Sequence, residues 1–147
     1  MSRPIIALTT DFGQADTYVG TMKGAILGIC PQAVLVDVTH EVRPQALNQA
    51  SFLLHNATPY FPPGTIHLVV IDPGVGSERR PIVVKAQRAI YVAPDNGVLT
   101  MALARDPART AIHLTESRYW LPQPSATFHG RDLFAPAAAY LACGIHP

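Results

Sequence analysis

The chain has 147 residues, which is enough for one domain with a hydrophobic core and too few for two domains of ordinary size. Its formal net charge is +1, so nothing electrostatic indicates nucleic acid or an anionic membrane as a partner. Apolar residues make up 48% and charged residues only 14%, a balance that favours a partner covering part of the apolar surface. No apolar run is long enough to span a membrane, and the first residues do not resemble a signal peptide.

The first half of the sequence alternates strand and helix patterns. Strands are predicted at residues 5–10, 34–39 and 65–71, because each is a short apolar run rich in β-branched residues. A helix is predicted between the first two strands, from 18 to 30, where Pro31 ends it. A second helix is predicted from Pro44 to about residue 60, before the turn signal Pro62-Pro63-Gly64.

The second half begins with a predicted hairpin of two short strands, 81–85 and 89–93. A short helix through residue 105, a strand at 110–114, a long loop at 115–130 and a final helix at 132–143 follow. The sequence then finishes on a turn signal, residues 144–147, which suggests a chain that has been cut. The predicted fold class is α/β, with a mostly parallel sheet and helices on both faces in three layers.

Polar residues gather where the predicted strands end. Asp11, His40, Asp72, the pair Asp95-Asn96 and the segment 128–132 each follow a strand or precede the last helix. Ligands of α/β proteins bind at the carboxyl ends of the parallel strands, so these groups are expected to face one crevice. Each also has a structural interpretation, because Asp-Asn-Gly is an ordinary turn signal and Asp132 can serve the first turn of a helix.

Asp72 is the most informative of these residues. It follows an apolar strand, precedes a glycine-rich segment, residues 73–77, and stands seven residues before Arg79. A carboxylate in this position can act as a base or bind a hydroxyl group, and an arginine beside it keeps it ionised. The alternative is a tight turn closed by a surface ion pair.

Several familiar site patterns are absent from the sequence. It contains no Walker-type phosphate loop, no GxGxxG after a strand, no GxSxG and no HExxH. The two cysteines, Cys30 and Cys143, lack a CxxC partner or a histidine at metal spacing, so a zinc site is not expected and both are interpreted as reduced core residues.

Five motifs in order along the chain resemble one known family. They are Thr9-Thr10-Asp11-Phe12-Gly13 with Tyr18-Val19-Gly20 and Lys23-Gly24, then Val36-Asp37-Val38-Thr39-His40, Asp72-Pro73-Gly74-Val75-Gly76, Ala93-Pro94-Asp95-Asn96-Gly97 and Phe128-His129-Gly130-Arg131-Asp132. Together they look like the S-adenosylmethionine hydroxide adenosyltransferase family, which is related to halogenating enzymes that use the same substrate. Because the motifs span nearly the whole chain, the resemblance is specific.

The resemblance implies that water, acting as hydroxide, attacks the ribose C5′ of S-adenosylmethionine and releases adenosine and L-methionine. It places the catalytic residues on Asp72, Arg79 and His129, without assigning the base between Asp72 and His129. It places the substrate-binding residues on Asp11, Phe12, Asp95, Asn96, Phe128 and Gly130. It implies no metal and no cofactor, because the sulfonium is already a good leaving group.

The resemblance also implies a context for the chain. Residues 1–147 correspond to the family's N-terminal catalytic α/β domain, and the family's C-terminal β-barrel domain is absent from this sequence. Family members are typically homotrimers whose sites lie between subunits, so we expect the fragment alone to turn over little substrate. A cytoplasmic, prokaryotic protein without nucleic-acid or membrane partners is implied.

The sequence leaves three alternative functions open. A halogenase is disfavoured because the related halogenases carry Tyr in place of Asp72 and His129 and Ser in place of Gly130. A non-catalytic module that binds adenosine or S-adenosylmethionine would keep Asp11 and tolerate loss of Asp72. A metal-dependent phosphoesterase would use Asp11, Asp72, Asp95-Asn96 and His129 as ligands.

Overall fold

A computed structural model describes residues 3–75 and 79–145 of the chain. Gly76 and Ser77 of the predicted glycine-rich segment and the following Glu78 lie outside the described residues, as do His146 and Pro147 of the predicted terminal turn. The strands are β1 (Ile5–Thr10), β2 (Val34–Thr39), β3 (Ile66–Val70), β4 (Pro81–Ala86), β5 (Ile90–Pro94) and β6 (Ala108–His113). The helices are α1 (Tyr18–Ile29), α2 (Leu47–Ala57), α3 (Thr100–Arg105) and α4 (Ala135–Ala142), with short turns η1 (Thr58–Tyr60), η2 (Ser117–Tyr119) and η3 (Gly130–Phe134).

The strands form one six-stranded sheet in the order β2-β1-β3-β5-β4-β6. The pairs β1–β2, β1–β3 and β3–β5 are parallel, whereas β4 pairs antiparallel with both β5 and β6. The predicted mostly parallel sheet and the predicted hairpin are therefore confirmed. The consequence for function is that β1, β2, β3 and β5 all end at the same edge.

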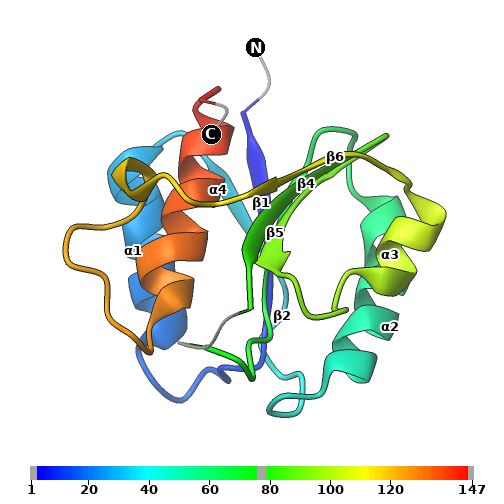
Figure 1. Cartoon of the computed structure of the whole chain (residues 1–147), viewed down its shortest axis with the longest axis horizontal. Coiled ribbons are helices and arrows are strands. Elements are labelled where there is room, and N and C mark those ends of the chain that lie inside the picture. Colours follow the sequence, from blue (N-terminus) through cyan, green and yellow to red (C-terminus); the bar gives the residue numbers. More distant parts are fainter. Residues whose placement is uncertain (1–2, 76–78, 146–147) are drawn as a thin grey trace.

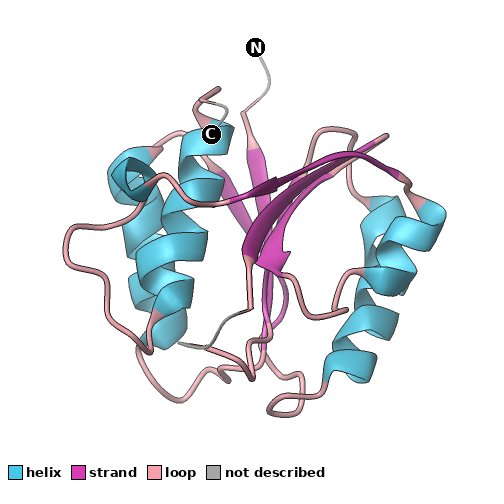
Figure 2. Cartoon of the chain, in the orientation of Figure 1, coloured by secondary structure: helices cyan, strands magenta, loops and turns pink. Residues whose placement is uncertain are grey.

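Helices cover both faces of the sheet, as predicted (Figure 1). On one face α1 and α4 pack over a core that includes Leu8, Met22, Leu68 and Phe134. On the other face α2 and α3 cover a second core cluster, which includes Leu54 and Tyr91. Figure 2 shows the sheet between these two pairs of helices, which gives the three-layer architecture.

The start of the last helix differs from the sequence prediction. Instead of a regular helix from residue 132, Gly130–Phe134 forms a π-helical turn that leads directly into α4. A π turn is wider than an α turn and is typical of functional positions in helices. Here it carries the Phe128-His129-Gly130 segment toward the carboxyl edge of the sheet. Gly144, with φ +87°, ends the helix in the left-handed conformation that glycine adopts easily.

The two cysteines differ in exposure. Cys30 is buried, as the sequence predicted, but Cys143 is exposed, so its assignment to the core is wrong. It is the C-cap residue of α4, one position beyond the last helical residue, and its Sγ donates to the carbonyl of Ile29 at 3.6 Å. None of the helices within the described ranges has the length and apolar character needed to cross a lipid bilayer.

Candidate active site at the carboxyl edge of the sheet

A cavity of about 530 Å³ lies at the carboxyl edge, within the range typical of small-molecule sites. Its lining residues come from four places in the sequence: the segment after β1 with the start of α1, the loop before α2, the end of β3 with the segment after it, and the residues around η3. They are Asp11, Phe12, Tyr18, Thr21, Pro44, Gln45, Val70, Asp72, Val75, Thr127, Phe128, His129, Gly130 and Arg131. Six residues predicted for the site, Asp11, Phe12, Asp72, Phe128, His129 and Gly130, are thus brought together.

Arg79 joins Asp72 and His129 into one cluster. Its Nε donates to Asp72 Oδ1 at 2.8 Å and one terminal nitrogen donates to Oδ2 at 2.6 Å, which is a bidentate ion pair. The same terminal nitrogen lies 2.6 Å from His129 Nδ1. The Asp72 and Arg79 side chains are only 6% and 10% exposed, so little water screens their charges.

The proton of His129 is located by this contact. A guanidinium group has only N–H donors, so Nδ1 of His129 must accept and the ring proton must be on Nε2. Burial and the positive charge of Arg79 lower the pKa of His129 from its ordinary value of 6.5. At neutral pH the ring is therefore uncharged, an acceptor toward Arg79 and a donor on its other side.

Aromatic rings form one wall of the cavity. The ring of Tyr18 lies between those of Phe12 and Phe128, with centroid distances of 6.1 and 5.2 Å. The guanidinium of Arg131 lies 5.0 Å from the centre of the Phe128 ring. Tyr18 and Arg131 belong to the motifs that resemble the family, but the sequence prediction did not name them as site residues. Aromatic faces attract cations, so this wall suits a positively charged ligand.

Asp11 lies on the side of the cavity formed by the loop before α2. Its Oδ2 accepts a hydrogen bond of 2.8 Å from the backbone N–H of Gln45, a residue held at φ +62°. A non-glycine residue rarely adopts this left-handed conformation, which strains the backbone. Such strained residues cluster at functional positions. Sequence reasoning missed Gln45 because nothing in a single sequence reveals such a backbone angle.

A hydrogen-bonded network around the buried His40 supports the Asp11 segment from behind. His40 Nδ1 lies 2.8 Å from the hydroxyl of Thr10, and His40 Nε2 lies 2.7 Å from Asp37. Lys23 donates to the other oxygen of Asp37 at 2.8 Å, and the backbone N–H of Gly13 donates to the carbonyl of His40 at 2.7 Å. His40 and Asp37 are therefore structural groups that fix the loop, as the sequence favoured, and His40 does not line the cavity.

We expect His40→Asn to destabilise the protein by about 1–3 kcal/mol, because the shorter side chain leaves Thr10 or Asp37 without its partner. The measurement is the free energy of unfolding from urea titration. His113→Asn, at an exposed position of β6, is the matched control and should change stability by less than about 0.5 kcal/mol. Equal stabilities of the two variants would contradict the network's role.

Asp95 and Asn96 do not line the cavity. Asn96 donates from Nδ2 to the carbonyl of Ile71 at 2.8 Å, directly before Asp72. Asp95 donates from its backbone N–H to the carbonyl of Arg80 at 2.7 Å and accepts from the Arg80 side chain at 2.9 Å. The pair thus holds both ends of the segment that carries Asp72 and Arg79.

Asp132 anchors the long loop before η3. Its carboxylate accepts hydrogen bonds from the Arg131 side chain at 2.6 and 3.0 Å and from the backbone N–H of Ser125 at 2.7 Å. These bonds lower the pKa of Asp132 although its burial opposes this. The residue is 2% exposed, so it stabilises the loop rather than facing the cavity.

Gly130 is required by close packing. A Cβ atom at this position would lie 3.1 Å from Cζ of Phe12 and 3.3 Å from Sδ of Met22. We expect Gly130→Ala to cost about 1–3 kcal/mol of stability, because Phe12 must move into the cavity. Gly28→Ala in α1 is the control, since a Cβ there meets no atom within 4 Å, and should stabilise by about 0.5–1 kcal/mol. Equal urea midpoints for both variants would show that the contact is unimportant.

Comparison with known proteins identifies the family of this chain. The family model described as the SAM hydroxide adenosyltransferase N-terminal domain matches residues 6–147. A curated protein of Thermus thermophilus, named (R)-S-adenosyl-L-methionine hydrolase, is 44% identical over 99% of this chain and 59% of its own length. A protein of the same name from Methanocaldococcus jannaschii is 44% identical over 92% of this chain and 52% of its own length. A fluorinase of an Actinoplanes species is 27% identical over 96% of this chain and 55% of its own length.

A solved structure of an uncharacterized conserved protein from Thermotoga maritima superposes with a TM-score of 0.94 at 43% identity, over 96% of this chain and 55% of the other. The chain thus spans between half and three-fifths of the length of these relatives. Because the family model covers nearly all 147 residues and the fold agrees, the chain belongs to the SAM hydroxide adenosyltransferase family, whose N-terminal domain it carries.

Proposed function

We propose that the protein hydrolyses S-adenosyl-L-methionine, with water attacking the ribose C5′ to give adenosine and L-methionine. The observation that carries the proposal is the buried Asp72–Arg79–His129 cluster beside a cavity with an aromatic wall. Four curated relatives named (R)-S-adenosyl-L-methionine hydrolase, 42 to 46% identical to this chain, support the same reaction.

The proposed reaction needs a base, and the geometry favours Asp72. A carboxylate offers about four acceptor positions, and Arg79 occupies two of them in Asp72. His129 has its Nδ1 lone pair directed at Arg79 and its proton on Nε2, so it donates to the water oxygen rather than removing a proton. Arg79 and the Nε2–H of His129 together stabilise the developing hydroxide.

The electron and proton movements then balance. A water proton passes to Asp72, the oxygen forms a bond with C5′, and the C5′–S bond breaks with its electron pair going to sulfur. The sulfonium becomes the neutral thioether of methionine, and the oxygen that remains on C5′ carries one proton as the 5′-hydroxyl of adenosine. An anion attacking a cation loses charge on the way to the transition state, so exclusion of bulk water from the buried cluster assists it.

The remaining cavity residues suit the substrate. The Asp11 carboxylate is suited to accept hydrogen bonds from the ribose hydroxyls while Gln45 holds its Oδ2. The rings of Phe12, Tyr18 and Phe128 offer apolar surface and negative faces toward the sulfonium. Asp95 and Asn96, which were predicted to bind substrate, contribute in this proposal by holding the Ile71–Arg80 segment behind the site.

Halide transfer is the second candidate because the fluorinases are relatives at 27 to 28% identity. The lower identity and the residues Asp72 and His129 favour water as the nucleophile. Gly130 adds a steric reason, since any side chain there must displace Phe12 or Met22.

We further propose that the reaction uses no metal and no cofactor, and that the protein acts in the cytoplasm of a prokaryote. Among the described residues no group of three or more His, Cys, Asp or Glu side chains is placed to hold a metal ion. We propose that the complete protein is a homotrimer and that the 147 residues alone turn over little substrate. The low proportion of charged residues, 14%, supports coverage of this domain by other protein surface.

The test uses the protein expressed from its complete reading frame. S-adenosylmethionine is supplied in halide-free buffer with EDTA and oxygen-18 water, and mass spectrometry follows the product. Adenosine carrying the heavy oxygen, absent with Asp72→Ala, is the expected result. No adenosine would refute the proposal and favour a binding module. A 5′-halo-adenosine formed only after chloride or fluoride is added would favour the halogenase.

A further inference from the structure

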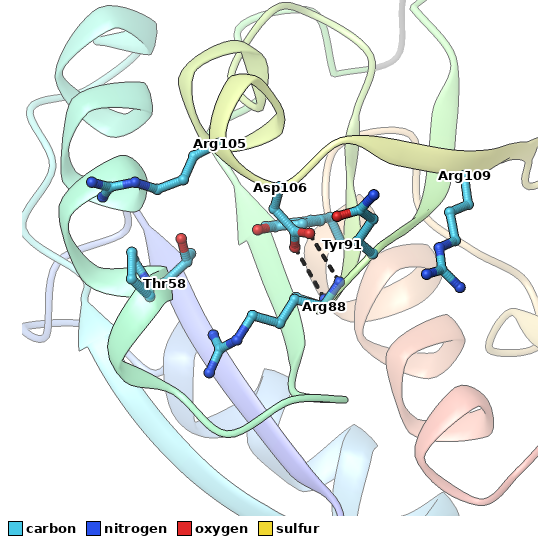
Figure 3. Close-up of a pocket in the computed structure, with 9 residues that line it drawn as sticks. Thr58, Arg88, Tyr91, Arg105, Asp106 and Arg109 are labelled. Atoms are coloured by element: carbon cyan, nitrogen blue, oxygen red, sulfur yellow. Dashed lines mark hydrogen bonds between the residues drawn. The ribbon is translucent and has the colours of Figure 1, made fainter.

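A second cavity lies at the opposite, amino edge of the sheet and takes no part in the proposed hydrolysis. Its volume is about 380 Å³, also within the range of small-molecule sites. It is formed by η1, the turn between β4 and β5, the end of α3 and the start of β6. Its lining is Thr58, Pro59, Gln87, Arg88, Ala89, Tyr91, Arg105, Asp106 and Arg109 (Figure 3).

Positive charge dominates this cavity. Arg88, Arg105 and Arg109 line it with a single carboxylate, that of Asp106. The two oxygens of Asp106 accept from the backbone N–H groups of Arg88 at 2.9 Å and Ala89 at 3.0 Å rather than from an arginine side chain among the described residues. Within residues 3–75 and 79–145, none of the three arginines forms an ion pair, and only Arg105 has a side-chain hydrogen bond, to the carbonyl of His55 at 3.1 Å.

The floor of the cavity holds an unused donor. Tyr91 is fully buried, and its hydroxyl lies near Thr58 and Asp106 without a hydrogen bond of ordinary length and angle to any described residue. Burial raises the pKa of Tyr91, so the group keeps its proton and remains a donor. A buried hydroxyl without a partner is unfavourable, and an acceptor atom of a ligand would satisfy it.

The ring of Tyr91 is held firmly in place. It stacks on His67 with 5.3 Å between centroids, and His67 in turn meets Phe61 edge-on at 5.2 Å. Burial lowers the pKa of His67 to about 4, so this histidine is neutral and adds no charge to the cavity. The hydroxyl therefore has a fixed position from which it can select a ligand by hydrogen bonding.

We propose that this cavity binds a small molecule bearing phosphate groups. Figure 3 shows Arg88 and Arg105 extending on the side of Thr58, with Arg109 on the other side of Tyr91. Guanidinium groups bind phosphate oxygens through paired N–H donors, and cations on both sides of a central donor suit an anion with more than one charged centre. A diphosphate group has this form. The site lies at the sheet edge away from Asp72, so it is independent of the proposed hydrolysis.

The test is isothermal titration of the complete protein with pyrophosphate at constant ionic strength, beside inorganic phosphate and citrate. We expect pyrophosphate to bind most tightly, and the double variant Arg88→Gln with Arg109→Gln to weaken it at least about tenfold. Tyr91→Phe keeps the stacked ring and should weaken binding several-fold. Arg118→Gln, an exposed arginine outside the cavity, is the matched control and should bind normally.

Three results would overturn the proposal. They are the absence of pyrophosphate binding, equal binding by the double variant and the Arg118→Gln control, and equal affinity for citrate, which would assign the site to carboxylates. Because the arginines of the double variant are exposed, circular dichroism should show normal folding. Hydrolysis of S-adenosylmethionine is assayed separately on the same variants, so failure of either proposal leaves the other intact.

Discussion

Replacing Asp72 with Asn should lower kcat for S-adenosylmethionine hydrolysis by about 10²–10⁴-fold, with a much smaller change in KM. The amide nearly preserves the size of the side chain but cannot take the proton from water. It also removes the negative half of a buried ion pair in which both carboxylate oxygens are bound by Arg79. Steady-state kinetics of the complete protein, followed by adenosine release, measures the effect.

Glu41→Gln is the control for Asp72→Asn, because it removes one carboxylate charge at an exposed position outside the cavity. It should leave kcat and KM unchanged. Thermal unfolding of both variants separates loss of chemistry from loss of fold. An Asp72→Asn variant that is folded and retains more than a tenth of the activity would exclude Asp72 as the base.

Arg79→Gln should lower kcat by about 10²–10³-fold, the usual effect of removing one group that stabilises a developing anion. The same change should raise the pKa of His129. Burial is the largest cause that lowers this pKa, and the positive charge of Arg79 is the second. Protonation of His129 would then occur at higher pH. The acid limb of the pH–rate profile should therefore move toward neutral pH in this variant.

The pKa of His129 is measured by NMR titration of its ring protons, which does not depend on activity. Arg118→Gln is the matched control, since Arg118 is 72% exposed and lies outside the cavity. It should change neither kcat nor the titration of His129. An unchanged His129 titration in Arg79→Gln would show that the contact of 2.6 Å between Arg79 and Nδ1 does not affect the pKa of the His129 ring.

Local sequence patterns were sufficient to predict most of the fold. The strands at Ile5–Thr10 and Val34–Thr39 appear where their β-branched apolar runs predicted them, because strands buried in a parallel sheet are apolar on both faces. Tyr18–Ile29 ends just before the predicted residue, since Pro31 prevents continuation. The last helix could not be predicted in detail, because the π turn at Gly130–Phe134 depends on what its side chains meet in the folded protein.

The candidate site, like the fold, could be predicted from the sequence only in part. The sequence by itself marked Asp11, Asp72, Arg79 and His129 as candidate site residues, because the topology of an α/β sheet brings strand ends to one edge and the motifs resemble a known family. Only the tertiary structure decided which of their atoms meet. The contact between Arg79 and Asp72 spans seven residues, but the contact between Arg79 and His129 crosses 50 residues of sequence, and no local pattern encodes it.

Tertiary structure also separated the cavity residues from those that hold them. Asp95 and Asn96 support the segment around Asp72 from outside the cavity, whereas Tyr18 and Gln45, which were not predicted as site residues, line it. The arginines of the second cavity come from three elements and look like ordinary surface charges in the sequence. The physical reason is common to all of these cases: hydrogen bonds and charges act over a few ångströms, so their partners are set by packing rather than by spacing along the chain.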